Sequence, residues 1–381
     1  MGDDRLHLFN KILTVILIVF LTSFALLFIL LPDQAFSETE NRMLQKKPAF
    51  SWDNLISGKF GSAVENYVAD QFAYRDMWVS LKSAAELILQ KKDNNGVYFG
   101  REGYLLQKPG KLDAALLAEN IDAVNRFAAN IPAKVYFLLA PSSVQVLADK
   151  LPHFVAPHPV NDQYISTKKL LSPKIKFIDT GPALAAHRQE YIYYKTDHHW
   201  TTRGAYYAYR EAGPLLDYKP LDINDFTIEQ VSSDFYGTLH AKSGHRFILP
   251  DVVQLFKPKR NFSCRVEYVN EKKTDQSLYA KEHLLQKDKY AVFLDGNHAL
   301  VRINVQNQTG RRLLVVKDSY ANCLLPFFAN HYDEMHVIDL RHFNTSLQGY
   351  VKQYGLNEIL FVYNALSFAG YPAIRKILPK S

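Results

Sequence analysis

An uninterrupted apolar run near the amino terminus constrains this chain more than any other feature. From Ile12 to Leu31 the sequence reads ILTVILIVFLTSFALLFILL, without a charged residue. Twenty residues in an α-helix are about 30 Å long, which matches the hydrocarbon core of a bilayer. A cleaved signal peptide has a shorter apolar run and a small-residue cleavage site, whereas Pro32 and Asp33 follow here. We therefore expect an uncleaved, single-pass transmembrane helix.

The charges on either side of this run predict its orientation. Arg5 and Lys11 precede it closely, whereas an acidic residue, Asp33, comes first after it. Positive charge beside a span favours the cytoplasmic side. We therefore expect residues 1–36 to form a cytoplasmic tail and membrane anchor, with the remaining chain outside the cytoplasm.

The composition is that of a globular protein and excludes some classes of function. Of 381 residues, 48% are hydrophobic and 22% are charged. The net charge of +7 is spread along the chain without a basic block, so no nucleic-acid partner is expected. Cys264 and Cys323 lack the spacing of a metal site. A buried thiol is favoured for Cys323, although a disulfide between the two stays open.

Two regions of different character follow the anchor. Residues 37–110 contain a polar stalk, a stretch with helical periodicity over 53–90, and a glycine-flanked hairpin over 96–106. Residues 111–381 alternate between strands and helices, which predicts an α/β domain with a mostly parallel sheet and helices on both faces. Within it, residues 220–310 are polar with short alternating runs, so we expect a β-rich insertion there.

The first chemistry-bearing stretch is Asp197-His198-His199-Trp200, just after the β-rich run Tyr191–Tyr194. An acid two residues before a histidine can lie beside its imidazole, where it selects the tautomer and stabilises the imidazolium. The structural alternative is a polar loop with a packed tryptophan, and the tetrapeptide alone leaves both interpretations open.

The second is Ser319, which follows the apolar strand Leu313–Val316 and begins a helix expected to reach about Ala329. Sites in parallel sheets form at the carboxyl ends of strands, and backbone N–H groups at a helix start favour developing negative charge. The alternative is that Asp318 and Ser319 only cap the helix. With His199 as base and Asp197 as orienting acid, Ser319 would complete a triad for acyl transfer.

Acyl transfer also needs donors for an oxyanion. The backbone N–H of Ser319 is one candidate, and the side chain of Asn364, at the end of another strand, is a second. Asn364 is equally typical of a turn after a strand. Arg341 would bind substrate or pair with Asp339, and Gly296-Asn297 would form an oxyanion or substrate loop or a plain turn.

The motifs together resemble the DHHW protein family. The resemblance rests on Thr196–Thr201 (TDHHWT) and Lys317–Asn322 (KDSYAN), with Ser37–Arg42 and Asn95–Gly100 in agreement. That family is similar to the alginate O-acetylation proteins, which carry an SGNH-hydrolase-like domain. In those proteins an Asp-x-His-Trp motif supplies acid and base, and a serine after a later strand is the nucleophile.

Carried over, the resemblance implies the roles already assigned to Asp197, His199 and Ser319. Because the histidine precedes the serine, it implies a circularly permuted SGNH topology. It also implies acetyl transfer to, or removal from, a cell-envelope polysaccharide, beside a membrane-bound O-acyltransferase partner, with no cofactor.

Two other functions compete with this hypothesis. A metal site would combine Asp197–His199 with His240, His245 or His298. We expect no metal, because adjacent histidines on a strand point to opposite faces and no HExxH spacing occurs. Alternatively, the domain is a non-catalytic SGNH-like module that binds glycan or scaffolds an envelope complex.

Overall fold

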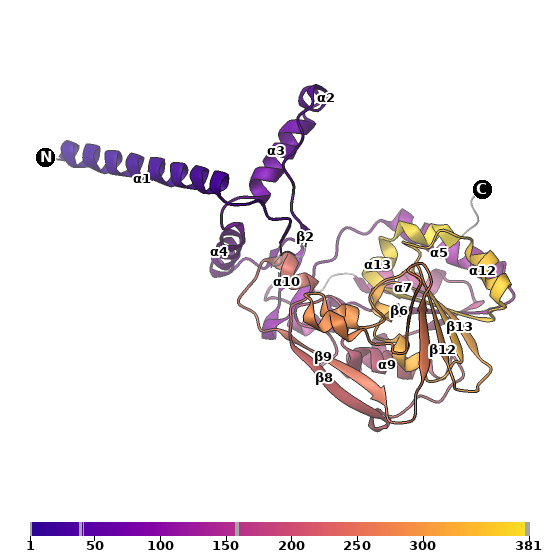
Figure 1. The fold of residues 1–381 in the computed structure, drawn as a ribbon. Helices are drawn as coiled ribbons and strands as arrows, with labels where there is room; N and C mark the ends of the chain where they lie inside the picture. Colours follow the sequence, from indigo (N-terminus) through magenta and orange to yellow (C-terminus); the bar gives the residue numbers. More distant parts are fainter. Residues whose placement is uncertain (1, 38–39, 41, 157–159, 378–381) are drawn as a thin grey trace. The chain divides into compact units, whose positions relative to one another are not determined.

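The computed structural model describes residues 2–37, 40, 42–156 and 160–377 (Figure 1). Two compact units emerge from the contacts within the chain. The first contains the chain up to Lys91 together with Gly244–Arg246, and the second contains Lys92–Ser243 and the chain from Phe247 onward.

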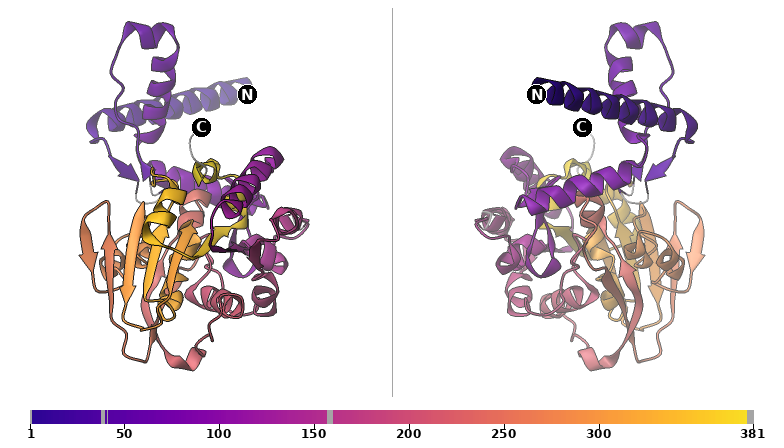
Figure 2. Two further views of the ribbon diagram at one scale, coloured as in Figure 1. Left: turned by 90° about the vertical axis from the view of Figure 1, so that its right-hand side faces the viewer. Right: turned by 90° about the vertical axis from the view of Figure 1, so that its left-hand side faces the viewer.

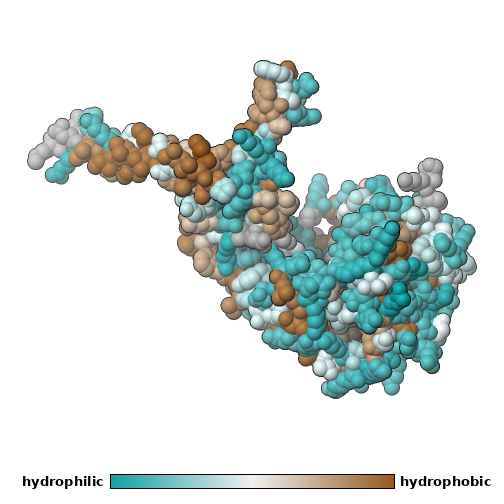
Figure 3. Space-filling view, in the orientation of Figure 1, coloured by the Kyte–Doolittle hydropathy of each residue, from teal (hydrophilic) through white to brown (hydrophobic). Residues whose placement is uncertain are grey.

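The first unit begins with helix α1, Gly2–Leu30. Its segment Arg5–Leu30 has 26 residues, about 39 Å in helical geometry. Most of its apolar side chains are exposed, and Figure 3 shows this apolar surface along the helix. In agreement with the expectation, α1 is long and apolar enough to cross a membrane once.

A short hairpin and three further helices complete the first unit. They are β1 (Phe36–Ser37), β2 (Arg42–Met43), α2 (Trp52–Ile56), α3 (Lys59–Asp70) and α4 (Arg75–Ile88). The predicted helical stretch over 53–90 is interrupted at Gly58 and Tyr74, whose φ angles are 75° and 56°. Arg42 donates hydrogen bonds of 2.8 and 2.5 Å to Asp70, which ties β2 to the end of α3.

A small antiparallel sheet opens the second unit. Its strands are β3 (Asp93–Asn94), β4 (Val97–Phe99) and β5 (Leu105–Gln107), so the expected hairpin is present. The sequence-based division groups this hairpin with residues 37–110. In the structure it lies in the second unit, because Val97 and Leu105 pack against Leu239 of α10, Thr238–Ser243.

An eight-stranded sheet forms the centre of the second unit, in the order β11-β10-β12-β14-β13-β15-β6-β7. The strands from β14 to β7 are parallel, as expected, and those from β11 to β14 pair antiparallel. Their bounds are β6 Lys134–Ala140, β7 Ile175–Ile178, β10 Cys264–Tyr268, β11 Lys273–Asp275, β12 Leu300–Val305, β13 Arg312–Lys317, β14 Glu334–Ile338 and β15 Glu358–Asn364.

Residues 220–310 are β-rich, but the expectation that they form a separate insertion is wrong for half of them. Strands β10, β11 and β12 extend the main sheet, because alternate side chains such as Val266 and Ile303 join its core. Only β8 (Phe226–Phe235) and β9 (Asp251–Pro258) form a ribbon of their own.

Helices cover both faces of the sheet (Figure 2). Alternation along β13 explains this: Val315 faces one core cluster, whereas Leu314 and Val316 face the other. One face carries α6 (Ser143–Val146), α8 (Gly181–Ala186), α9 (Thr202–Ala212) and α11 (Leu325–Phe328), and the other carries α5 (Ala114–Ala129), α7 (Val160–Leu170), α12 (Leu347–Tyr354) and α13 (Ala365–Ala369).

Two local predictions near the chemistry-bearing residues are wrong. Tyr191–Tyr194 is not a strand and makes only a single bridge, Tyr193 to Trp200. The helix expected after Ser319 is a 3₁₀ turn, Ser319–Ala321, followed by the separate α11. Pro326 explains the break, because it has no N–H to donate to the carbonyl four residues earlier.

Phe137 of β6 tests the packing of the sheet. Its buried ring lies 5.0 Å from that of Phe368 and 6.0 Å from that of Phe361, measured between centroids. We expect Phe137→Ala to lower the free energy of unfolding by about 3–5 kcal/mol, because it leaves a cavity. Phe247→Ala, at an exposed position, should change it little. Chemical unfolding of the purified chain in detergent measures both, and equal losses would contradict this assignment of the core.

Candidate active site

The carboxyl ends of the parallel strands bring several polar residues to one edge of the sheet. β13 runs directly into Asp318 and Ser319, β14 is followed by Asp339, and β15 ends at Asn364. In sheets of this type, ligands bind at this edge. The edge is therefore where a site should be sought.

Ser319, His199 and Asp197 lie together at this edge. The Ser319 Oγ is 2.7 Å from His199 Nε2, within the separation expected of a nucleophile and its base. His199 Nδ1 lies 2.5 Å from Asp197 Oδ1. Although 120 residues separate the serine from the histidine in sequence, their side chains form a continuous hydrogen-bonded chain from hydroxyl to carboxylate.

Asp197 is buried, and its carboxylate is fully hydrogen-bonded. Oδ1 also accepts from the His199 N–H at 3.0 Å, and Oδ2 accepts from the Thr238 N–H and hydroxyl at 2.8 and 2.9 Å. Burial opposes ionisation, but the neighbouring His198 and His199 and these hydrogen bonds outweigh it and hold the pKa of Asp197 well below its usual range. The carboxylate is therefore anionic at neutral pH.

The loop that carries these residues is held by a second buried acid, Asp251 of β9. Its carboxylate accepts hydrogen bonds of 2.7 Å from the backbone N–H groups of Lys195 and Thr196, and one of 2.5 Å from the Thr196 hydroxyl. On the other side, the Trp200 indole donates to the Tyr320 carbonyl at 2.9 Å. The loop is thus attached both to β9 and to the turn that contains Ser319.

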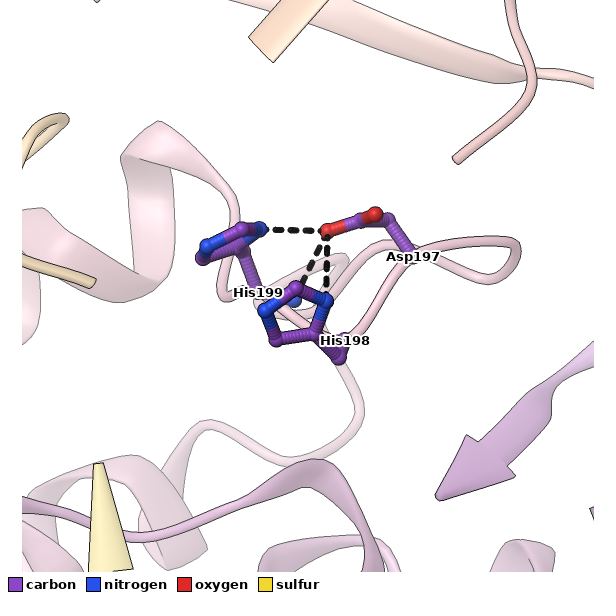
Figure 4. Close-up of side chains that lie close together, drawn as sticks. All are labelled: Asp197, His198 and His199. Carbon is purple, nitrogen blue, oxygen red and sulfur yellow. Dashed lines mark hydrogen bonds and ion pairs between the residues drawn. The ribbon is translucent and has the colours of Figure 1, made fainter. Parts of the chain in front are cut away.

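The expectation that the two histidines face opposite sides is wrong. Residues 195–199 form a bend rather than a strand, so the alternation rule does not apply. Figure 4 shows both rings beside the same carboxylate. Their centroids are 3.8 Å apart, and His198 Nδ1 lies 3.6 Å from Asp197 Oδ1 and 2.7 Å from the Thr238 hydroxyl.

Tyr290 supports the base and the nucleophile turn together. Its ring stacks on that of His199 with centroids 3.8 Å apart and planes 9° from parallel. Its hydroxyl donates to the Ser319 carbonyl at 3.1 Å and contacts Cys323 Sγ at 3.3 Å. Burial raises the pKa of the Cys323 thiol to about 12, and both cysteines are free, so this sulfur is an unreactive part of the core.

Asp318, rather than Ser319, caps the 3₁₀ turn. The Asp318 carboxylate accepts from the Tyr320 N–H at 2.9 Å and from the Asn364 N–H at 2.8 Å. The Asp318 N–H donates to the Val362 carbonyl at 3.1 Å. The N–H of Ser319, by contrast, has no hydrogen-bond acceptor within the part of the chain that the structure describes. The serine hydroxyl is therefore free to face His199, and its own N–H is available to an anion.

Two other residues considered for substrate or oxyanion binding are already engaged. The Asn364 side-chain amide donates to the Ala140 carbonyl at 3.1 Å and the Ser142 hydroxyl at 3.0 Å, and its oxygen caps α13. Arg341 pairs with Asp339, at 2.5 Å between Nη2 and Oδ2. In this arrangement Asn364 acts as a turn residue and Arg341 as an ion-pair partner.

Gly296 and Asn297 belong to a turn that contacts the residue preceding Asp318. The Lys317 ammonium donates to the side-chain oxygens of Asn297 and Asn322, both at 2.7 Å. Asn322 in turn donates to the Gly296 carbonyl at 3.0 Å. Lys317 is only 1% exposed, and burial lowers its pKa to about 8. In this arrangement Asn297 accepts directly from the buried lysine, and Gly296 accepts from Asn322, the second residue that binds the lysine.

The ligand atoms of Asp197, His198 and His199 lie within 4.8 Å of one another, as they would around a metal ion. Hydrogen bonds engage these atoms, however: the carboxylate oxygens accept from His199 and Thr238, and His199 Nε2 faces the Ser319 hydroxyl. The donor set is thus consistent with proton transfer without a metal.

A second group with metal-like spacing contains Glu282, His283 and Asp295. The Lys273 ammonium lies 2.8 Å from the Asp295 carboxylate and supplies the positive charge there. Within the described part of the chain, neither group includes the other histidines considered from the sequence, which are His240, His245 and His298.

Sequence reasoning missed the residues that support the triad. Thr238 and Tyr290 contact it directly, yet neither stands beside a motif residue in the chain. The one signal was Tyr236-Gly237-Thr238, in which the glycine leaves room for the acid: a Cβ on Gly237 would lie 2.2 Å from the Cβ of Asp197. Such a constraint between distant segments has no periodicity that would reveal it.

Comparisons with known proteins confirm the resemblance predicted from the sequence. A family model described as DHHW protein matches residues 175–338. Among solved structures, a DHHW family protein from Eubacterium siraeum is 25% identical, with a TM-score of 0.65 over 76% of this chain and 98% of that chain. No curated protein matches the chain.

Two further solved structures are similar to the chain. PatB1 from Bacillus cereus, solved with a sulfonyl adduct, is 23% identical, with a TM-score of 0.61 over 73% of this chain and 97% of that chain. The O-acetyltransferase domain of Pseudomonas putida AlgJ is 14% identical, with a TM-score of 0.45 over 72% of this chain and 92% of that domain. The likeness to PatB1 agrees with the mixed α/β fold and its large, mostly parallel sheet.

Gly237→Ala tests the close approach at Asp197. The added methyl group would overlap the Asp197 side chain, so we expect the free energy of unfolding to fall by about 1–3 kcal/mol. Gly110→Ala is the matched control, because a Cβ there meets nothing within 4 Å. Denaturant titration of both variants measures the difference, and a fully stable Gly237→Ala protein would contradict the geometry.

The buried Lys317 should make stability depend on pH. Between its pKa of about 8 and the ordinary value of 10.5, the unfolded chain binds a proton at this site that the folded chain does not. The free energy of unfolding should therefore rise with pH across this window, by about 3 kcal/mol for this group.

Lys317→Met should remove that rise, whereas Lys259→Met, at an exposed position, should keep it. The measurement is denaturant unfolding of all three proteins at pH 8 and at pH 10.5. An identical pH dependence in Lys317→Met would show that burial does not lower the pKa of Lys317.

Proposed function

We propose that the second unit is a serine-dependent acyl-transfer enzyme that O-acetylates, or deacetylates, a cell-envelope polysaccharide. The observation that carries the proposal is the hydrogen-bonded chain from the Ser319 hydroxyl through His199 to Asp197, with separations of 2.7 and 2.5 Å. Its members have the residue types and the mutual positions that activate a serine.

In the first step, His199 Nε2 takes the proton from Ser319 Oγ as this oxygen attacks the carbonyl carbon of an acyl donor. The carbonyl oxygen becomes an oxyanion, for which the Ser319 N–H is a suitable donor. When the tetrahedral intermediate collapses, the bond to the leaving group breaks and the His199 imidazolium returns the proton to that group. An acyl ester on Ser319 is the product.

In the second step, a sugar hydroxyl attacks the acyl ester and His199 takes its proton. The ester bond to Ser319 breaks, and the proton returns to Ser319 Oγ. Water in place of the sugar gives hydrolysis, so the balance between transferase and esterase depends on which acceptor reaches the ester. Asp197 remains ionised throughout, because its pKa lies well below its usual range.

The proposal also includes the acceptor, the partner protein and the orientation of the chain in the membrane. The DHHW resemblance supports an envelope polysaccharide as acceptor and a membrane-bound O-acyltransferase as source of the acyl group. Helix α1 supports attachment to the membrane. Arg5 and Lys11 support an amino terminus in the cytoplasm, with the second unit outside.

Ser319→Ala should abolish acetyl-ester hydrolysis by the purified full-length chain. The expected loss is several orders of magnitude, because the nucleophile, and with it the acyl-enzyme route, disappears. The matched control is Ser233→Ala, which removes an exposed hydroxyl of β8 and should leave the rate unchanged. Ester turnover followed by absorbance measures both, and full activity of Ser319→Ala would remove this serine from the mechanism.

A fluorophosphonate probe separates the enzyme from the competing non-catalytic function. The proposal requires covalent labelling of the wild-type chain at Ser319 and loss of labelling in His199→Ala. A folded chain whose Ser319 stays inert to the probe would favour the glycan-binding or scaffold module instead.

A further inference from the structure

Helix α4 of the first unit carries an apolar stripe that the fold leaves uncovered. Met77, Leu81 and Ile88 are 55%, 57% and 82% exposed. At 100° per residue their directions fall within about 40° of one another, so they form one face of the helix. Tyr74 and Leu89 extend the exposed apolar surface beyond both ends of α4. A face of this kind indicates contact with an apolar environment.

Contacts within the first unit connect this helix to α1. The ring of Phe24, in α1, stacks on that of Phe72 with centroids 5.2 Å apart and planes 2° from parallel. It also meets the Trp78 ring of α4 at 5.8 Å. Nearer the end of α1, Phe28 meets Tyr67 of α3 at 5.7 Å.

These contacts set the depth of α4 if α1 spans a bilayer. Phe24 lies six residues before Leu30, the end of α1, and so about 9 Å inside the span. Phe72 and Trp78, which pack against Phe24, must lie at a similar depth. The first turn of α4 therefore lies at the level of the lipid rather than in bulk water.

The polar groups of the same region are arranged as they would be at an interface. Just beyond α1, Asp33 accepts a hydrogen bond of 2.9 Å from the Tyr67 hydroxyl. Arg75 pairs with Glu40 at 2.8 Å. On α4 itself Lys82 and Glu86 point about 120° and 160° away from Ile88, and the Lys82 side chain is 70% exposed. An apolar face opposite a charged one is typical of helices that lie in a bilayer surface.

We infer that the stripe formed by Met77, Leu81 and Ile88 lies in the boundary between headgroups and acyl chains, in the leaflet where α1 ends. The first unit then rests on the bilayer as well as crossing it. Lipid covers the stripe, because Phe72 and Trp78 connect it to the apolar surface of α1 that faces the lipid. The inference requires α1 to be in the membrane, as in the proposed function, but it is independent of the serine chemistry.

Single cysteines labelled with an environment-sensitive fluorophore test this placement in the full-length chain. Leu81→Cys and Ile88→Cys probe the stripe, Lys82→Cys is the matched control on the polar side of the same helix, and Ile16→Cys reports on α1. The native cysteines are buried, and the unmodified chain gives their background. The labelled proteins are reconstituted into phosphatidylcholine–phosphatidylglycerol vesicles and quenched either by doxyl lipids or by aqueous iodide.

We expect fluorescence at positions 81 and 88 to be lost with lipids doxylated near the headgroup and to resist iodide. Position 82 should show the reverse, and position 16 should be quenched by lipids doxylated deep in the acyl chain. If position 16 is deep but positions 81 and 88 respond like position 82, the inference is overturned while the anchor stands. If position 16 is not quenched by lipid, the anchor fails and the inference with it.

Shielding of position 81 from both quenchers would also overturn the inference, because protein rather than lipid would then cover the stripe. Mixing labelled with unlabelled chains identifies that protein. Fluorescence that changes on mixing indicates a second copy, and fluorescence that does not change indicates another part of the same chain.

Discussion

The buried carboxylate of Asp197 is the group on which the arrangement above the sheet depends. An ionised acid out of contact with water is tolerated only when its oxygens are hydrogen-bonded. Here the two oxygens accept from the backbone and imidazole of His199 and from the backbone and hydroxyl of Thr238. The same set of bonds therefore draws two distant segments together, orients the imidazole, and leaves its far nitrogen pointing at Ser319.

Three consecutive residues, Lys317, Asp318 and Ser319, have different roles in the turn that follows β13. Lys317 is buried and bound to amide oxygens of Asn297 and Asn322, which connects the end of β13 to the neighbouring loop. Asp318 caps the turn and binds the Asn364 N–H at the end of β15. Lys317 and Asp318 make the hydrogen bonds that hold the turn in place. The hydroxyl and the N–H of Ser319 are therefore not needed to hold the turn and remain available for chemistry.

The central strands and their helices were predictable because each signal is local. A buried parallel strand such as Leu313–Val316 is apolar throughout, and a capped helix such as α9 begins at a threonine, so neighbouring residues are sufficient to recognise them. The sequence-based assignment of strands to the sheet failed where the strand that pairs with them is distant in the chain. Residues 264–305 alternate like an independent β region, and only pairing of β12 with β14 makes β10, β11 and β12 part of the main sheet.

By itself, the sequence determined that the chain has a membrane-length apolar helix and an α/β domain with a mostly parallel sheet, and it indicated a serine, a histidine and an acid as candidates for one site. These follow from composition and period, which are properties of adjacent residues. Only the tertiary structure decided that Ser319 faces His199, that Asp318 is the cap, and that Asn364 and Arg341 are engaged elsewhere. Those outcomes depend on which buried polar groups meet at the sheet edge. The contacts of Ser319 with His199 and of Asn364 with Ala140 join residues more than a hundred positions apart, and such contacts leave no pattern in the chain.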